Sequence, residues 1–475
     1  MGGLFDFIRI LINISLLWVG FFFLVKLLIL IFPRLLEYIN RYQIIISLFQ
    51  ISIRTTKLNG PIQRLSIKFQ RLWQYWFNVG MVVSLLTLPI SIGLFVYNLG
   101  ILVVKPQNIE PIINPIVPGV NVQGQDSWYL FISLLISMFY HELGHALCIY
   151  SFNSRINDIG FFMTFIIPGA HVDIHRDVLY RLDLWDRLKV FCAGVWHNLA
   201  LCIMALLLMN ANFIILSPLY HFSSDKLYIT HISDHSILQK SFNIGDQIVS
   251  INQCTPTNIQ QYIECIESEI KNPKSYCLSE SNIQCLNDQI INDSPHMRQC
   301  FDYNELLKYQ QCTSSQNGTS SNGQCASGSR CIQFAKFNYH LFIINATEQN
   351  PSKYGTELIP FVGTAQELWD SFTLNNYKAR LTWMSHWDIP RHLQSFYQYL
   401  IPISLGLAVF NVVSIYALDG EYILETLLYI FASKQGGKQS QFTPKITRIQ
   451  KIILNTTLVL LLLNILISYY QLFAK

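Results

Sequence analysis

Long apolar runs separated by charged stretches set the pattern of this chain. Each run holds about 20 residues, the length that a helix needs to cross the hydrocarbon core of a bilayer. Six runs meet this length, at 10–32, 79–104, 128–150, 188–217, 397–418 and 452–474. Because backbone groups in lipid must be satisfied within the segment, we predict a polytopic α-helical membrane protein with about six transmembrane helices.

The first apolar run can be read as an anchor or as a removed signal peptide. It is long, carries Lys26 and lacks a clear small-residue cleavage site. These features favour an N-terminal transmembrane anchor at 1–32, with a cleaved signal as the alternative.

Composition supports the membrane assignment and indicates which classes of partner the protein contacts. Of the 475 residues, 51% are apolar and 13% are charged, whereas soluble domains carry roughly 25% charged residues. The net charge is +4, but the Lys and Arg residues lie beside apolar runs and form no stripe interleaved with aromatics. We therefore expect membrane lipid as a partner and no nucleic acid.

Two basic clusters orient the predicted helices. Positively charged loops stay in the cytosol, which places there the segment 33–78 and the linker before the last run. The residues concerned are Arg34, Arg41, Arg54, Lys57, Arg64, Lys68 and Arg71, and then Lys434, Lys438, Lys445, Arg448 and Lys451. The layout predicts a first membrane half at 79–217, in which 151–187 sits on or dips into the cytosolic face. A lumenal domain at 218–395 and a second membrane half at 396–475 follow.

Cysteines and glycosylation sequons fit the same layout. Eight of the 11 cysteines fall in the predicted lumenal domain, where up to four disulfides are expected and 105 connectivities are open. They are Cys254, Cys265, Cys277, Cys285, Cys300, Cys312, Cys325 and Cys331. Cys148, Cys192 and Cys202 lie in apolar runs and are expected to pack as small apolar side chains. Sequons at Asn317 and Asn345 are candidate glycosylation sites, and the sequon at Asn292 is weaker. A structural metal site among the cysteines is a less favoured alternative, because zinc-knuckle spacing is absent.

The predicted lumenal domain shows strand patterns at both of its ends. The stretch from Tyr228 to Asn252 contains the Gly245-Asp246 turn, after which apolar and polar residues alternate as in a half-buried strand. Tyr339 to Ile344 is a second strand-like run. The Gly-Asp-x-Ile-x-x-Ile-Asn string is similar to the core of PDZ domains. We expect a β-rich, PDZ-like domain interrupted by a disulfide-rich insertion at about 254–335. A generic β-rich domain is the alternative.

A metal-binding motif lies inside the third apolar run. The sequence His141-Glu142-Leu143-Gly144-His145 puts both imidazoles on one helix face, where they can share one zinc ion. Glu142 then lies beside them as the catalytic base. Ionisable residues in an apolar helix are costly and are by default functional. The structural alternative is a histidine cluster at a helix interface or along a proton path.

A catalytic zinc site needs a third protein ligand, and Asp419 is the candidate. Both 128–150 and 397–418 run from lumen to cytosol in the layout above, so His145 and Asp419 should lie at similar membrane depth. Asp419-Gly420 can also be read as a plain helix cap or turn.

At this point the residues resemble a known family, the eukaryotic site-2 proteases, membrane metalloproteases that release membrane-tethered transcription factors. The resemblance covers most of the chain. It rests on His141-Glu142-x-x-His145, Leu418-Asp419-Gly420 preceded by Asn411, Phe191-Cys192-Ala193-Gly194-Val195-Trp196-His197-Asn198, Pro168-Gly169-Ala170-His171-Val172-Asp173, Trp76-Phe77-Asn78-Val79-Gly80-Met81 and Val117-Pro118-Gly119-Val120-Asn121.

The resemblance implies one catalytic zinc on His141, His145 and Asp419. It also implies that Asn198 and Asn411 contact the substrate backbone or a developing oxyanion, although helix packing explains a lone Asn equally well. Ser414 stands where the family has proline, which removes a helix kink close to the third ligand.

The same resemblance implies transmembrane substrates that a lumenal protease has already trimmed, and a lumenal domain that serves as a size filter or docking module. It implies residence in the Golgi or endoplasmic reticulum, with the active site toward the cytosol. Two alternatives remain open. A membrane metallopeptidase of the prenyl-protein type would need a downstream Glu as third ligand. The second alternative is a non-catalytic zinc-binding or zinc-transporting protein: the intact Glu142 speaks against an inactive scaffold, and a transporter would be expected to show internal repeats.

Overall fold

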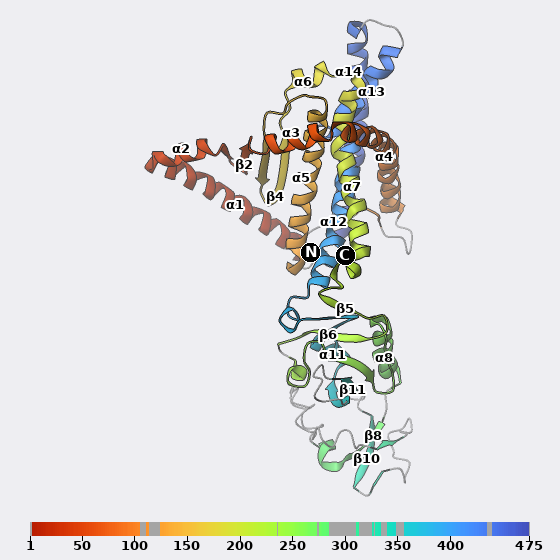
Figure 1. The fold of residues 1–475 in the computed structure, drawn as a ribbon. Coiled ribbons are helices and arrows are strands. Elements are labelled where there is room, and N and C mark those ends of the chain that lie inside the picture. Colours follow the sequence, from red (N-terminus) through yellow and green to blue (C-terminus); the bar gives the residue numbers. More distant parts are fainter. Residues whose placement is uncertain are drawn as a thin grey trace. The chain divides into compact units, whose positions relative to one another are not determined.

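The chain folds into two compact units in the computed structural model (Figure 1). The helical unit comprises Met1–Asn210 and Leu393–Lys475, and the sheet unit comprises Ala211–His392. The structure describes residues 2–104, 111–113, 124–234, 236–272, 275–284, 310–312, 325–326, 328–333, 340–347, 356–434 and 439–474.

Six described helices are long and apolar enough to cross a membrane, which confirms the predicted polytopic fold class. They are α1 (Gly2–Ile31), α4 (Gln70–Val104), α5 (Ser127–Ser151), α7 (Leu184–Leu216), α12 (Ile389–Val412) and α14 (Gln439–Ala474). Large apolar side chains on them are exposed, such as Leu17 at 72% and Leu30 at 79%. Such surfaces suit contact with lipid tails better than contact with water.

The predicted span 397–418 is wrong at its C-terminal end. Helix α12 stops at Val412, the chain turns, and α13 (Asp419–Lys434) begins at Asp419. The turn is tight, since a Cβ on Gly420 would lie 2.1 Å from the Val413 carbonyl oxygen. Thr457 of α14 donates a hydrogen bond to the Ser414 carbonyl. The helix therefore ends here without a proline at position 414, because tertiary contacts hold the turn.

A four-stranded antiparallel sheet, absent from the sequence-based prediction, joins two distant segments of the helical unit. Its order is β1 (Ile44–Ser47), β2 (Gln50–Thr55), β3 (Ile159–Thr164) and β4 (Ile167–Val172). The first two strands come from the stretch predicted only as a basic segment. Helices α2 (Pro33–Arg41), α3 (Asn59–Lys68) and α6 (Arg176–Arg181) flank these strands in the chain. In the sheet order β4 is an edge strand, and it packs beside α5.

Helices α5 and α7 approach each other at the level of the His-Glu-x-x-His motif. A Cβ on Gly144 would lie 2.6 Å from the Ala193 carbonyl oxygen and 2.8 Å from the His197 ring. Small residues permit such close backbone approach between membrane helices. The histidines of α5 consequently lie directly against the backbone of α7.

The sheet unit is built around five antiparallel strands in the order β12-β11-β7-β6-β13. Their bounds are Thr356–Gly363, His340–Thr347, Gln247–Ile251, Leu227–Ile232 and Phe372–Asn375. Both strand-like runs of the sequence form strands, β7 and β11, and these pair with each other. Phe342 and Ile344 are fully buried in the core of the unit, to which α8 (Ile259–Lys271) and α11 (Ala365–Ser371) also contribute. Tyr339 lies outside the described residues.

Among the described residues, three disulfides join cysteines of the sheet unit: Cys254–Cys265, Cys277–Cys325 and Cys312–Cys331. The second of these joins β8 (Ser275–Ser279) to Cys325, which precedes β10 (Ser329–Gln333) in the chain. The third joins β9 (Gln311–Cys312) to β10. Cys285 and Cys300 lie outside the described residues, as do the sequons at Asn292 and Asn317. Cys148, Cys192 and Cys202 are free and buried, as the sequence predicts.

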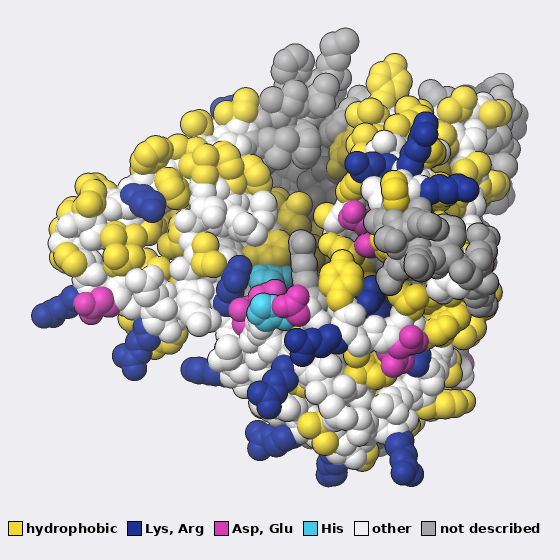
Figure 2. All heavy atoms as spheres, turned by 90° about the horizontal axis from the view of Figure 1, so that it is seen from above, with side chains coloured by type: hydrophobic (Ala, Val, Ile, Leu, Met, Phe, Trp, Pro, Cys, Tyr) yellow, Lys and Arg dark blue, Asp and Glu magenta, His cyan; other side chains and the backbone are white. Residues whose placement is uncertain are grey.

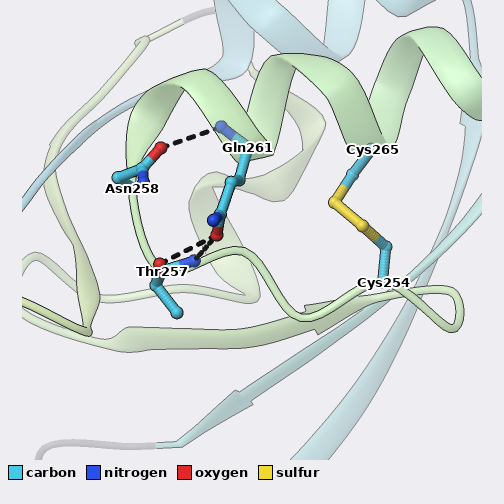
Figure 3. Close-up of a disulfide and its surroundings, with 5 residues drawn as sticks. All are labelled: Cys254, Thr257, Asn258, Gln261 and Cys265. Atoms are coloured by element: carbon cyan, nitrogen blue, oxygen red, sulfur yellow. Dashed lines mark hydrogen bonds between the residues drawn. A yellow bond between two sulfur atoms is a disulfide. The ribbon is translucent and has the colours of Figure 1, made fainter.

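The disulfide Cys254–Cys265 ties the middle of α8 to the segment that precedes the helix (Figure 3). Asn258 caps α8 by accepting a hydrogen bond from the Gln261 backbone N–H at 2.9 Å. The Gln261 side chain accepts in turn from the backbone N–H and the hydroxyl of Thr257, at 2.9 and 2.8 Å. The loop before α8 is thus held both covalently and by its own side chains.

Candidate metal centre

The two motif histidines lie on one face of α5, as their spacing predicts. Their Nε2 atoms are 3.2 Å apart, and His141 and His145 are 7% and 8% exposed. Adjacent turns of one helix therefore aim two imidazole nitrogens at the same point.

Asp419 brings a carboxylate to that point from the start of α13. Its Oδ2 lies 3.0 Å from the Nε2 of His141 and 3.3 Å from the Nε2 of His145. Tetrahedral coordination with bonds of about 2.0–2.1 Å separates neighbouring ligand atoms by about 3.3 Å. The three atoms, which can together hold a metal ion, thus already form a triangle of the right size.

The hydrogen bonding of His145 indicates which of its two ring nitrogens carries the hydrogen. Its Nδ1 lies 2.8 Å from the Val190 carbonyl oxygen, which can only accept a hydrogen bond. In the neutral imidazole the hydrogen is therefore on Nδ1, and Nε2 presents a lone pair to the carboxylate of Asp419. Two acceptors facing each other at 3.3 Å repel unless a proton or a metal cation lies between them. The donor set fits a metal such as zinc.

Glu142 is held at the side of the triangle by the edge strand of the sheet. The backbone N–H of Val172, the last residue of β4, donates to Oε2 of Glu142 at 2.9 Å. A carboxylate that accepts one backbone hydrogen bond keeps further lone pairs for other protons. This side chain can therefore be fixed in place and still serve as a base.

Gly194 of α7 supplies the space that the ligand atoms occupy. A Cβ at this position would lie 2.4 Å from Nε2 of His145 and 2.5 Å from Nε2 of His141. Real Cβ atoms essentially never approach other atoms so closely. The glycine is required by this close approach and not by an unusual backbone angle.

We expect Gly194→Ala to lose the metal. The added methyl group must displace both imidazoles, at an overpacking cost of about 1–3 kcal/mol, and the ligand triangle opens. Metal analysis of the purified variant should show zinc far below one ion per chain. Gly93→Ala in α4 is the matched control, because its Cβ would meet nothing within 4 Å. Full zinc occupancy in Gly194→Ala would contradict the placement of the site.

The two asparagines singled out by the sequence occupy different surroundings. Asn198 is fully buried, and its side-chain amide lies 3.1 Å from Nδ1 of His141. Asn411 is half-buried, next to the last residue of α12, and within the described residues its side chain makes no hydrogen bond. Substrate or oxyanion contact by either residue stays a prediction.

Some residues of the site were not assigned a role from the sequence. Val172 and Val190 act through backbone atoms, so their side chains carry no signal. Gly194 and His197 belong to the sequence motif that includes Asn198, but the motif by itself does not indicate what either residue does. His197 is buried, accepts a hydrogen bond from the Trp76 indole at 3.3 Å and stacks on Phe77.

One face of the molecule gathers charged side chains around histidine. Figure 2 shows histidine and acidic side chains together on this face, with Lys and Arg side chains around them. Exposed basic residues of the helical unit include Arg54, Lys57, Arg64, Lys68 and Arg71. These belong to the first basic cluster of the sequence.

Comparison with known proteins agrees with this chemistry. Residues 129–463 match Peptidase family M50. A membrane-bound transcription factor site-2 protease homolog from Arabidopsis thaliana is 25% identical over 453 residues, which cover 80% of this chain and 85% of the relative. The range that matches the family spans the positions of His141, His145 and Asp419.

Proposed function

This chain belongs to peptidase family M50 and is a metalloprotease, and we propose that it is a zinc endopeptidase that cleaves other proteins within their membrane-spanning segments. The observation that carries the proposal is the triangle of His141 Nε2, His145 Nε2 and Asp419 Oδ2, with edges of 3.0 to 3.3 Å. These three atoms would hold the zinc. When bound, zinc supplies Lewis-acid activation of water and of the scissile carbonyl.

Glu142 is the general base of the proposed reaction. Its carboxylate accepts a proton from the attacking water and then passes that proton to the leaving amine. The hydrogen bond from Val172 N–H keeps Oε2 oriented while the carboxylate carries the proton. No covalent intermediate with the protein is needed, since water is the nucleophile.

A transmembrane substrate must unwind before it is cleaved, because its backbone carbonyls are hydrogen-bonded inside its own helix. The edge strand β4 offers an unwound segment new partners. Val172 directs its N–H away from β3 and toward Glu142, and strand alternation directs the backbone groups of Ala170 the same way. An extended substrate along β4 would thus run past the catalytic base.

The sheet unit is proposed to be a lumenal, PDZ-like docking module or size filter. The three disulfides between its described residues support an oxidising compartment, and its apolar core around Phe342 supports independent folding. The natural substrates are proposed to be membrane-tethered proteins, such as transcription factors, already trimmed by a lumenal protease. The secretory pathway, with the metal centre toward the cytosol, is the proposed location.

The two alternatives fit the site less well. A prenyl-protein-type peptidase would use a Glu as third ligand, whereas Asp419 occupies that position. A transporter would not need Glu142 held by Val172 beside the metal ligands.

Chelation should separate a protease from a zinc carrier. We expect purified protein in liposomes to cleave a co-reconstituted single-span substrate, to lose cleavage with a zinc chelator, and to regain it after stoichiometric zinc is added back. Liposomes with the substrate alone are the control. Zinc flux into the liposomes with no cleavage would favour the transporter instead.

A further inference from the structure

We propose that Asn198 is a positioning residue that accepts a hydrogen bond from Nδ1–H of His141 and thereby aims Nε2 at the zinc. The proposal rests on the zinc site proposed above. It gives Asn198 a different task from substrate or oxyanion contact, since the residue then acts through a metal ligand.

The contact itself is short and fully buried. The Asn198 amide nitrogen lies 3.1 Å from Nδ1 of His141, and the Asn198 side chain has no solvent exposure. Within the described residues the other amide atom, Oδ1, is buried without a hydrogen-bond partner. The oxygen and nitrogen of an Asn side chain are assigned from such networks, so the two can be exchanged. Exchange gives the oxygen the donor that it lacks.

The exchanged orientation is also the one that metal binding requires. If the amide nitrogen donated to Nδ1 of His141, the ring hydrogen would stand on Nε2 and block that ligand atom. With Oδ1 facing Nδ1, the hydrogen is on Nδ1 and the Nε2 lone pair is free. Ligating histidines almost always donate their other ring N–H to such an acceptor.

Helix α7 positions both motif histidines. Val190, Gly194 and Asn198 follow one another at intervals of four residues and so form one stripe of the helix. The Val190 carbonyl contacts His145, Gly194 leaves room for both rings, and the Asn198 amide contacts His141. The position of Asn198 is fixed from α12, where the Ser404 hydroxyl donates to its backbone carbonyl at 2.9 Å.

Two substitutions separate this role from its rivals. Asn198→Leu removes the acceptor but keeps a side chain that branches at Cγ, and Asn198→Asp keeps an acceptor but cannot donate. The matched control is Asn210→Leu, an exposed Asn on α7 whose side chain donates a hydrogen bond to the Leu206 carbonyl. The readouts are the zinc dissociation constant, by competition with a fluorescent chelator, and the thermal midpoint of the metal-free protein.

We expect Asn198→Leu to weaken zinc binding about 10–100-fold, with Asn198→Asp staying within about threefold of wild type. Equal zinc affinity in Asn198→Leu and wild type would overturn the proposal, as would an equal loss in both variants, because an acceptor role requires rescue by Asp. A lower thermal midpoint with unchanged zinc affinity would assign Asn198 to helix packing. If wild-type protein itself bound no zinc, the proposed function would fail first, so the two failures are distinguishable.

Discussion

Glu142→Gln is expected to lower the cleavage rate of a membrane-embedded substrate by about 10²–10⁴-fold while one zinc ion per chain stays bound. The amide has the shape of the carboxylate and still accepts the hydrogen bond from Val172 N–H. It cannot take a proton from water, however, so only the base is removed. The measurement is single-turnover cleavage together with metal analysis of the same preparation.

Glu425→Gln is the matched control for this prediction. Glu425 is a half-buried carboxylate of α13 that takes no part in the triangle of ligand atoms. Its variant should keep both zinc and activity near wild type. Undiminished cleavage by Glu142→Gln would rule out Glu142 as the base, whereas loss of zinc from that variant would show that the carboxylate also supports the metal.

Asp419→Ala should abolish cleavage by a different route, through loss of the metal. Replacing an outer hydrogen-bond partner of a ligand costs about 10–100-fold in affinity, and removal of a ligand atom should cost at least as much. The remaining histidines, 3.2 Å apart at Nε2, would offer two ligands where catalytic zinc needs three. Equilibrium dialysis against buffered zinc gives the affinity, and substrate cleavage at saturating zinc gives the residual activity.

Asp419→Asn is the control for a folding defect in Asp419→Ala. Asn keeps the side-chain volume between His141 and His145, so the metal-free variant should unfold near the wild-type temperature. It exchanges a charged ligand oxygen for a weak neutral one, so zinc affinity should fall nearly as far as in Asp419→Ala. Stoichiometric zinc and full activity in both variants would refute Asp419 as the third ligand.

The sequence determined the parts of the protein that depend on neighbours along the chain. Helical periodicity alone places His141 and His145 on one face with Glu142 beside them. The length of the apolar runs predicts the six long helices, because bilayer thickness fixes how many residues a span needs. Strand alternation similarly predicts β7 and β11, although not the strand order around them.

Tertiary structure decided what completes the site. The span that leads to Asp419 ends at Val412, because contacts such as that between Thr457 and Ser414 hold a turn there. Asp419 therefore reaches the histidines from the start of a new helix, and not from the last turn of the old one. The absence of a proline at Ser414 does not predict this, since the turn is stabilised by a residue far away in sequence.

The groups that orient the metal ligands and the base could not be predicted from the sequence either. Val172 orients the base and Val190 orients His145 through backbone atoms, which every residue type possesses. Gly194 matters only because two imidazoles occupy the space that its Cβ would fill. The sequence thus determined which side chains can bind a metal, whereas packing between α5, α7 and β4 decided where those side chains point, because side-chain direction in a close-packed site depends on contacts between distant segments.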